Sequence, residues 1–146
     1  NLCRCRNVEI LPYALGTENK PITMANDSAR ETGYFGTGQN FVNDSGAAAA
    51  AQFSAQMRRG SELFAGLERL DFVKCDIEGY EVVVLTELRP LLERFRPTVL
   101  VETGGGNRPR IVELFTALGY KAFTLERGRE IPLTAASTKD IIFRPQ

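Results

Sequence analysis

The second half of the chain alternates short apolar runs with segments in which apolar residues recur at helical spacing. The apolar runs are the expected strands, and they cover residues 70–75, 98–102, 120–125 and 140–143. After the first of these runs, apolar residues recur at i, i+4, i+7 and i+11 from Val84, which predicts one helix face packed on a sheet. Parallel neighbours need such crossovers, so the pattern predicts a three-layer α/β/α fold with a mostly parallel sheet.

The first half of the chain is less regular. Residues 8–14 predict a strand, and Pro12 within it suits an edge position. Residues 16–46 are dense in glycine, asparagine, aspartate and serine, which predicts loops with one short strand at residues 22–24.

An alanine-rich segment follows these loops. Residues 47–59 have high helix propensity and few helix-breaking residues, so they predict a helix. Residues 20–60 therefore read as a loop-rich insertion with one alanine-rich helix, inside a single domain that spans residues 1–146.

Composition is that of an ordinary globular domain. The chain is 43% hydrophobic and 25% charged, and its 18 Lys+Arg balance its 18 Asp+Glu. A neutral chain without a basic stripe argues against a nucleic-acid partner. No apolar run approaches the roughly 20 residues of a membrane-spanning helix, and no signal peptide is visible, so we expect a cytoplasmic protein.

The chemistry most visible in the sequence lies where the strand at residues 70–75 ends. Asp76, Glu78 and Glu81 follow that strand within six residues. Charge on a buried strand is costly unless it is paired, and ligands of open α/β sheets bind at the carboxyl ends of strands. We therefore expect these carboxylates to take part in binding or catalysis.

Metal binding through cysteine is not expected. Cys3 and Cys5 form a Cys-x-Cys pair, but the chain has no histidine and no second cysteine pair to complete a zinc site. Cys75 is expected to pack as a small apolar residue on the strand face opposite Lys74 and Asp76. Converging carboxylates can also hold a divalent cation, but their spacing does not decide this, and we predict no metal.

One segment of the chain closely resembles a known family signature. Its residues are Lys74, Asp76, Glu78, Gly79 and Glu81. This Lys-x-Asp-x-Glu-Gly-x-Glu pattern is similar to that of the FkbM family of S-adenosylmethionine-dependent methyltransferases, and the likeness continues into the strand at residues 98–102. The resemblance implies a Rossmann-like class I methyltransferase fold. It further implies S-adenosylmethionine as cofactor and O-methylation of a hydroxyl on a sugar or secondary metabolite, so that the acceptor is a small molecule or a glycan.

The resemblance also implies roles for individual residues. Asp76 is expected to contact the cofactor or the acceptor, and Glu78 to act as general base or acceptor ligand. Glu102, at the tip of the next strand, is expected to face the same crevice. Lys74 is interpreted first as a buried counter-ion of the acidic cluster and second as a catalytic residue, and Ala14 and Leu15 are expected to contact the adenine.

The chain departs from the family pattern at its beginning. The strand and glycine loop that bind the cofactor's methionine in the family are not visible, and neither is the strand that follows them. The cluster at residues 104–106 follows the wrong strand and has Pro109 where a dinucleotide fingerprint needs glycine. We therefore expect the chain to be the C-terminal portion of a methyltransferase domain.

Two alternatives remain open. The chain could be a non-catalytic binding or interaction module on a methyltransferase-like scaffold, because fold does not fix function. It could also bind a sugar or a phosphate through residues 104–106 at a helix N-terminus. The sequence does not predict the oligomeric state.

Overall fold

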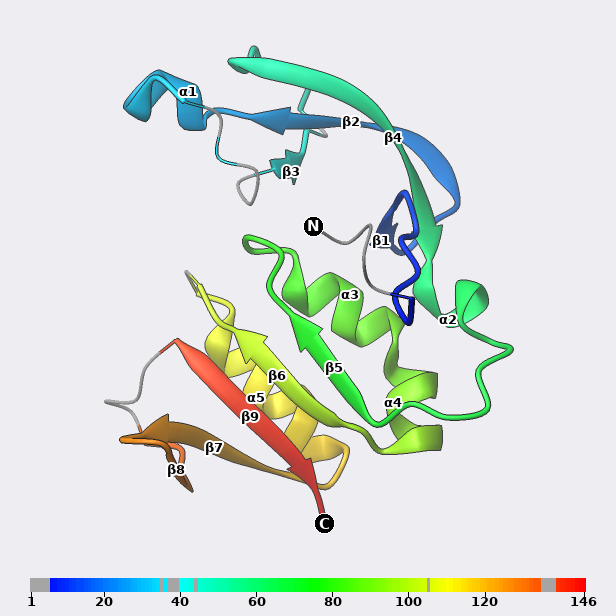
Figure 1. Ribbon diagram of the computed structural model, residues 1–146, viewed down its shortest axis with the longest axis vertical. Helices are drawn as coiled ribbons and strands as arrows, with labels where there is room; N and C mark the ends of the chain where they lie inside the picture. Colours follow the sequence, from blue (N-terminus) through cyan, green and yellow to red (C-terminus); the bar gives the residue numbers. More distant parts are fainter. Residues whose placement is uncertain (1–5, 35, 37–39, 44, 105, 135–138) are drawn as a thin grey trace.

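The computed structural model describes residues 6–34, 36, 40–43, 45–104, 106–134 and 139–146. Within these ranges the chain forms two β-sheets, which lie in different parts of the molecule (Figure 1). The first half of the chain builds a four-stranded sheet and the second half builds a five-stranded sheet. None of the helices in these ranges is long and apolar enough to cross a membrane.

The four-stranded sheet has the strand order β1-β4-β2-β3. Its strands are β1 (Tyr13–Gly16), β2 (Lys20–Asn26), β3 (Asn40–Val42) and β4 (Ala51–Arg59). Strand β4 pairs parallel with β1 and antiparallel with β2. Two short helices flank these strands, α1 (Ser28–Thr32) after β2 and α2 (Gly60–Leu63) after β4.

Two predictions for this half of the chain need correction, and a third is confirmed. The helix predicted for residues 47–59 is wrong, because β4 pairs with every residue of β2. The hydrogen bonds of this ladder outweigh the helix propensity of alanine. The strand predicted for residues 8–14 begins only at Tyr13, directly after Pro12. The short strand predicted for residues 22–24 is confirmed as the centre of the longer strand β2.

The five-stranded sheet has the strand order β5-β6-β9-β7-β8. Its strands are β5 (Phe72–Cys75), β6 (Thr98–Glu102), β7 (Tyr120–Glu126), β8 (Arg129–Pro132) and β9 (Asp140–Pro145). Only β5 and β6 pair in parallel, and β9 is antiparallel to both of its neighbours. The protein is thus an α/β protein with mixed sheets, and the expectation of a mostly parallel sheet is wrong, because the described strands of each sheet form one parallel pair, β1–β4 in one and β5–β6 in the other.

Strand β8 was not expected, since its residues lie outside the apolar runs that predict strands. It forms a tight hairpin with β7 through Arg127 and Gly128, which both have positive φ angles, 50° and 77°. Two such residues suit a two-residue hairpin turn, but the usual first residue is asparagine or aspartate. Because arginine occupies that position, the sequence does not indicate the turn.

Three helices cover one face of the five-stranded sheet (Figure 1), namely α3 (Glu81–Glu87), α4 (Arg89–Phe95) and α5 (Arg108–Ala117). Pro90 lies in the first turn of α4, where its missing N–H costs no hydrogen bond. Gly119, with φ 74°, follows the end of α5 in the left-handed conformation that glycine commonly adopts there. In the described residues no helix packs on the opposite face of this sheet.

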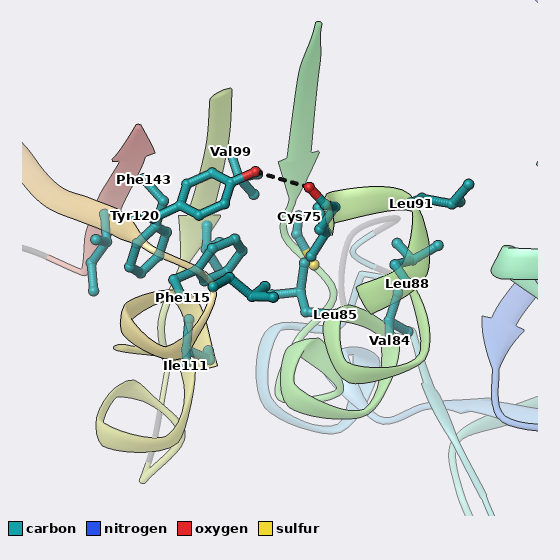
Figure 2. Close-up of a cluster of buried hydrophobic side chains, with 14 residues drawn as sticks. Cys75, Val84, Leu85, Leu88, Leu91, Val99, Ile111, Phe115, Tyr120 and Phe143 are labelled. Carbon is teal, nitrogen blue, oxygen red and sulfur yellow. Dashed lines mark hydrogen bonds between the residues drawn. The ribbon is translucent and has the colours of Figure 1, made fainter. Parts of the chain in front are cut away.

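The main hydrophobic core lies between these helices and the sheet (Figure 2). Phe115 of α5 is fully buried and stacks on Phe143 of β9, with ring centroids 4.1 Å apart. Its other neighbour is the ring of Tyr120, which meets it edge-on at 5.2 Å. The Tyr120 hydroxyl donates a hydrogen bond of 3.4 Å to the carbonyl oxygen of Leu92. This core fixes the positions of β5 and β6, whose carboxyl ends carry the acidic residues.

Candidate active site

An acidic crevice lies at the carboxyl ends of β5 and β6. Its volume is about 400 Å³, and it is lined by Asp76, Glu78, Gly79, Glu81, Glu102, Gly104, Asn107 and Lys139. Because β5 and β6 are parallel neighbours, Cys75 of β5 lies beside Val101 of β6, and both strands end at the same edge. The structure thus brings Glu102, at the end of β6, close to Asp76 and Glu78, which follow β5. Their roles stay predictions.

Lys74 and Asp76 form an ion pair at the edge of this crevice. The Lys74 ammonium donates a hydrogen bond of 2.6 Å to the Asp76 carboxylate. This hydrogen bond lowers the pKa of Asp76 and raises that of Lys74. The side chains of Lys74 and Asp76 are 58% and 36% exposed. Lys74 is therefore a counter-ion of Asp76, but the prediction that it is buried is wrong, because no described helix covers this face of the sheet.

The pKa of Glu102 is shifted in the opposite direction from that of Asp76. The negative charge of Asp76 is the main cause that raises the pKa of Glu102, and desolvation and the charge of Asp140 act in the same direction. The pKa values of these two neighbouring carboxylates are therefore shifted in opposite directions, that of Asp76 downward and that of Glu102 upward. Such a pair supplies an ionised ligand and a better proton acceptor side by side.

This coupling predicts the outcome of a charge substitution. Asp76→Asn removes the repelling charge, so the pKa of Glu102 should fall toward its ordinary value. Lys74→Met should raise the pKa of Asp76, because it removes the hydrogen bond that stabilises the ionised carboxylate. Both shifts are measured by carboxyl-carbon NMR during a pH titration. A Glu102 pKa that stays unchanged in Asp76→Asn would show that the two carboxylates are not coupled.

The loop between β5 and α3 has an unusual backbone. Glu78 and Gly79 both have positive φ angles, 52° and 98°. The first of these is costly for a residue with a Cβ atom and persists only where the surroundings hold it. Glu81, only 2% exposed, accepts hydrogen bonds from the backbone N–H groups of Gly79 at 2.8 Å and Ile77 at 3.3 Å.

Asn107 joins this loop to the other wall of the crevice. Its side-chain amide donates to the carbonyl oxygen of Gly79 at 2.8 Å and to the second carboxylate oxygen of Glu81 at 3.2 Å. Sequence reasoning missed this residue, because asparagine before a helix ordinarily indicates only a cap. It also gave no sign that Glu81 is buried, since a glutamate in the first helical turn is usually exposed and favoured by the helix dipole.

A second cavity, the apolar cleft, lies between the two sheets and has a volume of about 530 Å³. Ala14 and Leu15 of β1 line it, together with apolar side chains that include Met24 and Phe41. Its lining also includes Asp76, Glu78 and Gly79, which line the acidic crevice as well. The loop after β5 thus lies between the two cavities and contributes residues to the lining of both. The residues expected to contact adenine therefore lie in the same cleft as the acidic loop.

The chemistry of metals and thiols adds little to this site. Among the described residues no group of three possible metal ligands occurs, and Cys3 and Cys5 lie outside the described ranges. Cys75 is buried on the face opposite Lys74, as expected, and burial raises the pKa of its thiol to about 12. Such a thiol stays protonated and unreactive at neutral pH.

Fold and site together define an α/β protein with an acidic crevice at the carboxyl ends of two parallel strands. The family model of the methyltransferase FkbM domain matches residues 2–122. The chain therefore belongs to the FkbM methyltransferase domain family, which confirms the resemblance found in residues 74–81. No curated protein and no solved structure matches the chain.

Proposed function

We propose that the protein transfers a methyl group from S-adenosylmethionine to a hydroxyl group of a sugar or secondary metabolite. One observation carries this proposal: the apolar cleft and the acidic crevice meet at Asp76 and Glu78. A cofactor in one cavity and an acceptor in the other would meet at these two carboxylates. Family membership supports methyl transfer, and the acceptor is our own inference.

The chemistry of the two cavities suits that cofactor. Ala14, Leu15 and Phe41 offer apolar surface for a purine ring, and Asp76 offers an ionised carboxylate to the cofactor's hydroxyls and positive charges. When bound, the cofactor supplies a methyl group that is already activated. The protein then needs to align the acceptor and to remove its proton.

The carboxylates of the crevice can supply both of these functions. We assign Glu78 as general base or acceptor ligand, since it stands at the junction of the two cavities. Glu102, whose pKa is raised, is placed to hold the acceptor hydroxyl or take up its proton. Lys74 keeps Asp76 ionised through their hydrogen bond.

Within the part of the chain that the structure describes, no strand is followed by a glycine loop of the kind that binds this cofactor. We therefore propose that these 146 residues are the C-terminal portion of the methyltransferase domain and that upstream residues complete the cofactor site. We further propose a cytoplasmic location. The carboxylates around Gly104 count against a phosphate ligand there, because anions repel one another.

Calorimetric titration of S-adenosylhomocysteine into the full-length protein tests the proposal. We expect saturable binding with one site per chain. Absence of binding would contradict methyl transfer and favour the alternative, a non-catalytic module on a methyltransferase-like scaffold. The same titration into the 146-residue chain tests the second part, and we expect weaker binding there, because part of the site would be missing.

A further inference from the structure

Glu81 lines the acidic crevice, but its carboxylate is already fully engaged by the protein. One oxygen accepts the N–H groups of Ile77 and Gly79, and the other accepts the amide of Asn107. The residue is 2% exposed, so a ligand in the crevice has little access to it. Glu81 therefore differs from Asp76 and Glu78, which line both cavities.

The hydrogen bonds of Glu81 stabilise the conformation of the loop that carries Asp76 and Glu78. The loop runs from Asp76 to Tyr80, and Glu81 holds two of its backbone N–H groups from the following helix. Glu78 in the middle of the loop has a φ of 52°, a conformation that a glutamate does not keep without support. A buried charge is itself tolerated only where hydrogen bonds satisfy it, and here they come from the loop and from Asn107.

Asn107 extends this support across the crevice. It lies after β6, just before α5, and donates to the Gly79 carbonyl oxygen and to Glu81. Gly79 is thus held on both sides, its N–H by Glu81 and its carbonyl by Asn107. The two walls of the crevice are tied together at this glycine.

We propose that Glu81 and Asn107 are positioning residues that hold Asp76 and Glu78 in the geometry that binds the cofactor. The inference rests on the proposed function, because it concerns the same site. It adds that the last glutamate of the family-like motif acts through the loop and does not touch the ligand.

The test uses a pair of substitutions that exchange donor and acceptor. Glu81→Gln keeps an oxygen for the loop but turns an amide toward the amide of Asn107, and Asn107→Asp places a second carboxylate against Glu81. In the double variant, the glutamine amide can again donate to the aspartate, whereas the Gly79 carbonyl oxygen stays without the donor that Asn107 supplies. We expect each single variant to weaken S-adenosylhomocysteine binding about tenfold, and the double variant to recover part of the affinity lost in Asn107→Asp.

Controls separate positioning from general destabilisation. Glu113→Gln, on the exposed side of α5, should leave binding unchanged. The hydrogen-exchange rate of the Gly79 amide without ligand should rise in Glu81→Gln and fall again in the double variant. Asn107→Ala keeps the Glu81 contacts to the loop, so it serves as a milder variant if Glu81→Gln does not fold, and it too should weaken binding.

The outcomes distinguish the two proposals. Wild-type affinity in both single variants, or no recovery in the double variant, would overturn the positioning role and leave the proposed function intact. No binding by the wild-type full-length protein would overturn the proposed function and the positioning role with it.

Discussion

Asp76→Ala is expected to weaken S-adenosylhomocysteine binding by the full-length protein about 10- to 100-fold, the effect of losing a charged hydrogen-bond partner. Asp76 is the one residue predicted both to bind the cofactor and to take part in catalysis. It lies where the apolar cleft and the acidic crevice meet. The fold should remain, because its ion pair with Lys74 is exposed and such pairs contribute little to stability. Calorimetry measures the affinity, and circular dichroism checks the fold.

Asp71 offers a matched control for this substitution. It precedes β5 at the opposite end from Asp76 and forms an exposed ion pair with Arg69. Asp71→Ala removes the same carboxylate chemistry without approaching either cavity, so binding should stay at the wild-type level. Equal affinity of Asp76→Ala and wild type would remove Asp76 from the site.

Phe115→Ala is expected to lower the free energy of unfolding by about 3–5 kcal/mol, which is the usual cost of truncating a buried phenylalanine. The ring is fully buried between Tyr120 and Phe143 (Figure 2), and its loss leaves a cavity between α5 and the sheet. Domains of this size are typically stable by about 5–15 kcal/mol, so the variant should be close to unfolding. Equilibrium unfolding in urea measures the difference.

Phe72→Ala is the control for burial. Phe72 lies on the uncovered face of the same sheet and is 54% exposed, so the same truncation there leaves no enclosed cavity. Its effect on the unfolding free energy should be well below half that of Phe115→Ala. Equal losses in the two variants would contradict the assignment of the core to the helix-covered face.

Local pattern predicted four of the five strands described in the second half of the chain, β8 being the exception. The strand predicted at residues 98–102 coincides with β6, and the apolar residues predicted to line one helix face from Val84 lie in or beside α3 and α4. These features depend on neighbours in the sequence, through the period of the apolar side chains. The antiparallel placement of β9 does not follow from the pattern of its own residues.

The first half depends on contacts between distant residues. Residues 47–59 have the composition of a helix, yet β4 becomes a strand because β1 and β2 supply hydrogen-bond partners on both of its edges. Nothing within those residues signals the pairing. A different reason applies to β8, which pairs locally with β7 but through a turn that has an arginine in place of the usual asparagine.

The candidate site shows the same division. That Asp76, Glu78 and Glu102 meet at one edge was predicted, because the ends of parallel neighbouring strands must lie together. The burial of Glu81 and its contact with Asn107 were not, since they depend on how two loops pack against each other. The exposure of Lys74 was missed because it depends on what covers the sheet face.

The most direct measurement is NMR mapping of S-adenosylhomocysteine on the full-length protein, with backbone amides assigned. We expect the largest shift changes on the loop from Asp76 to Gly79 and on Ala14 and Leu15, which line the same cleft. Saturable changes confined to other residues, with these amides unmoved, would contradict the proposed site.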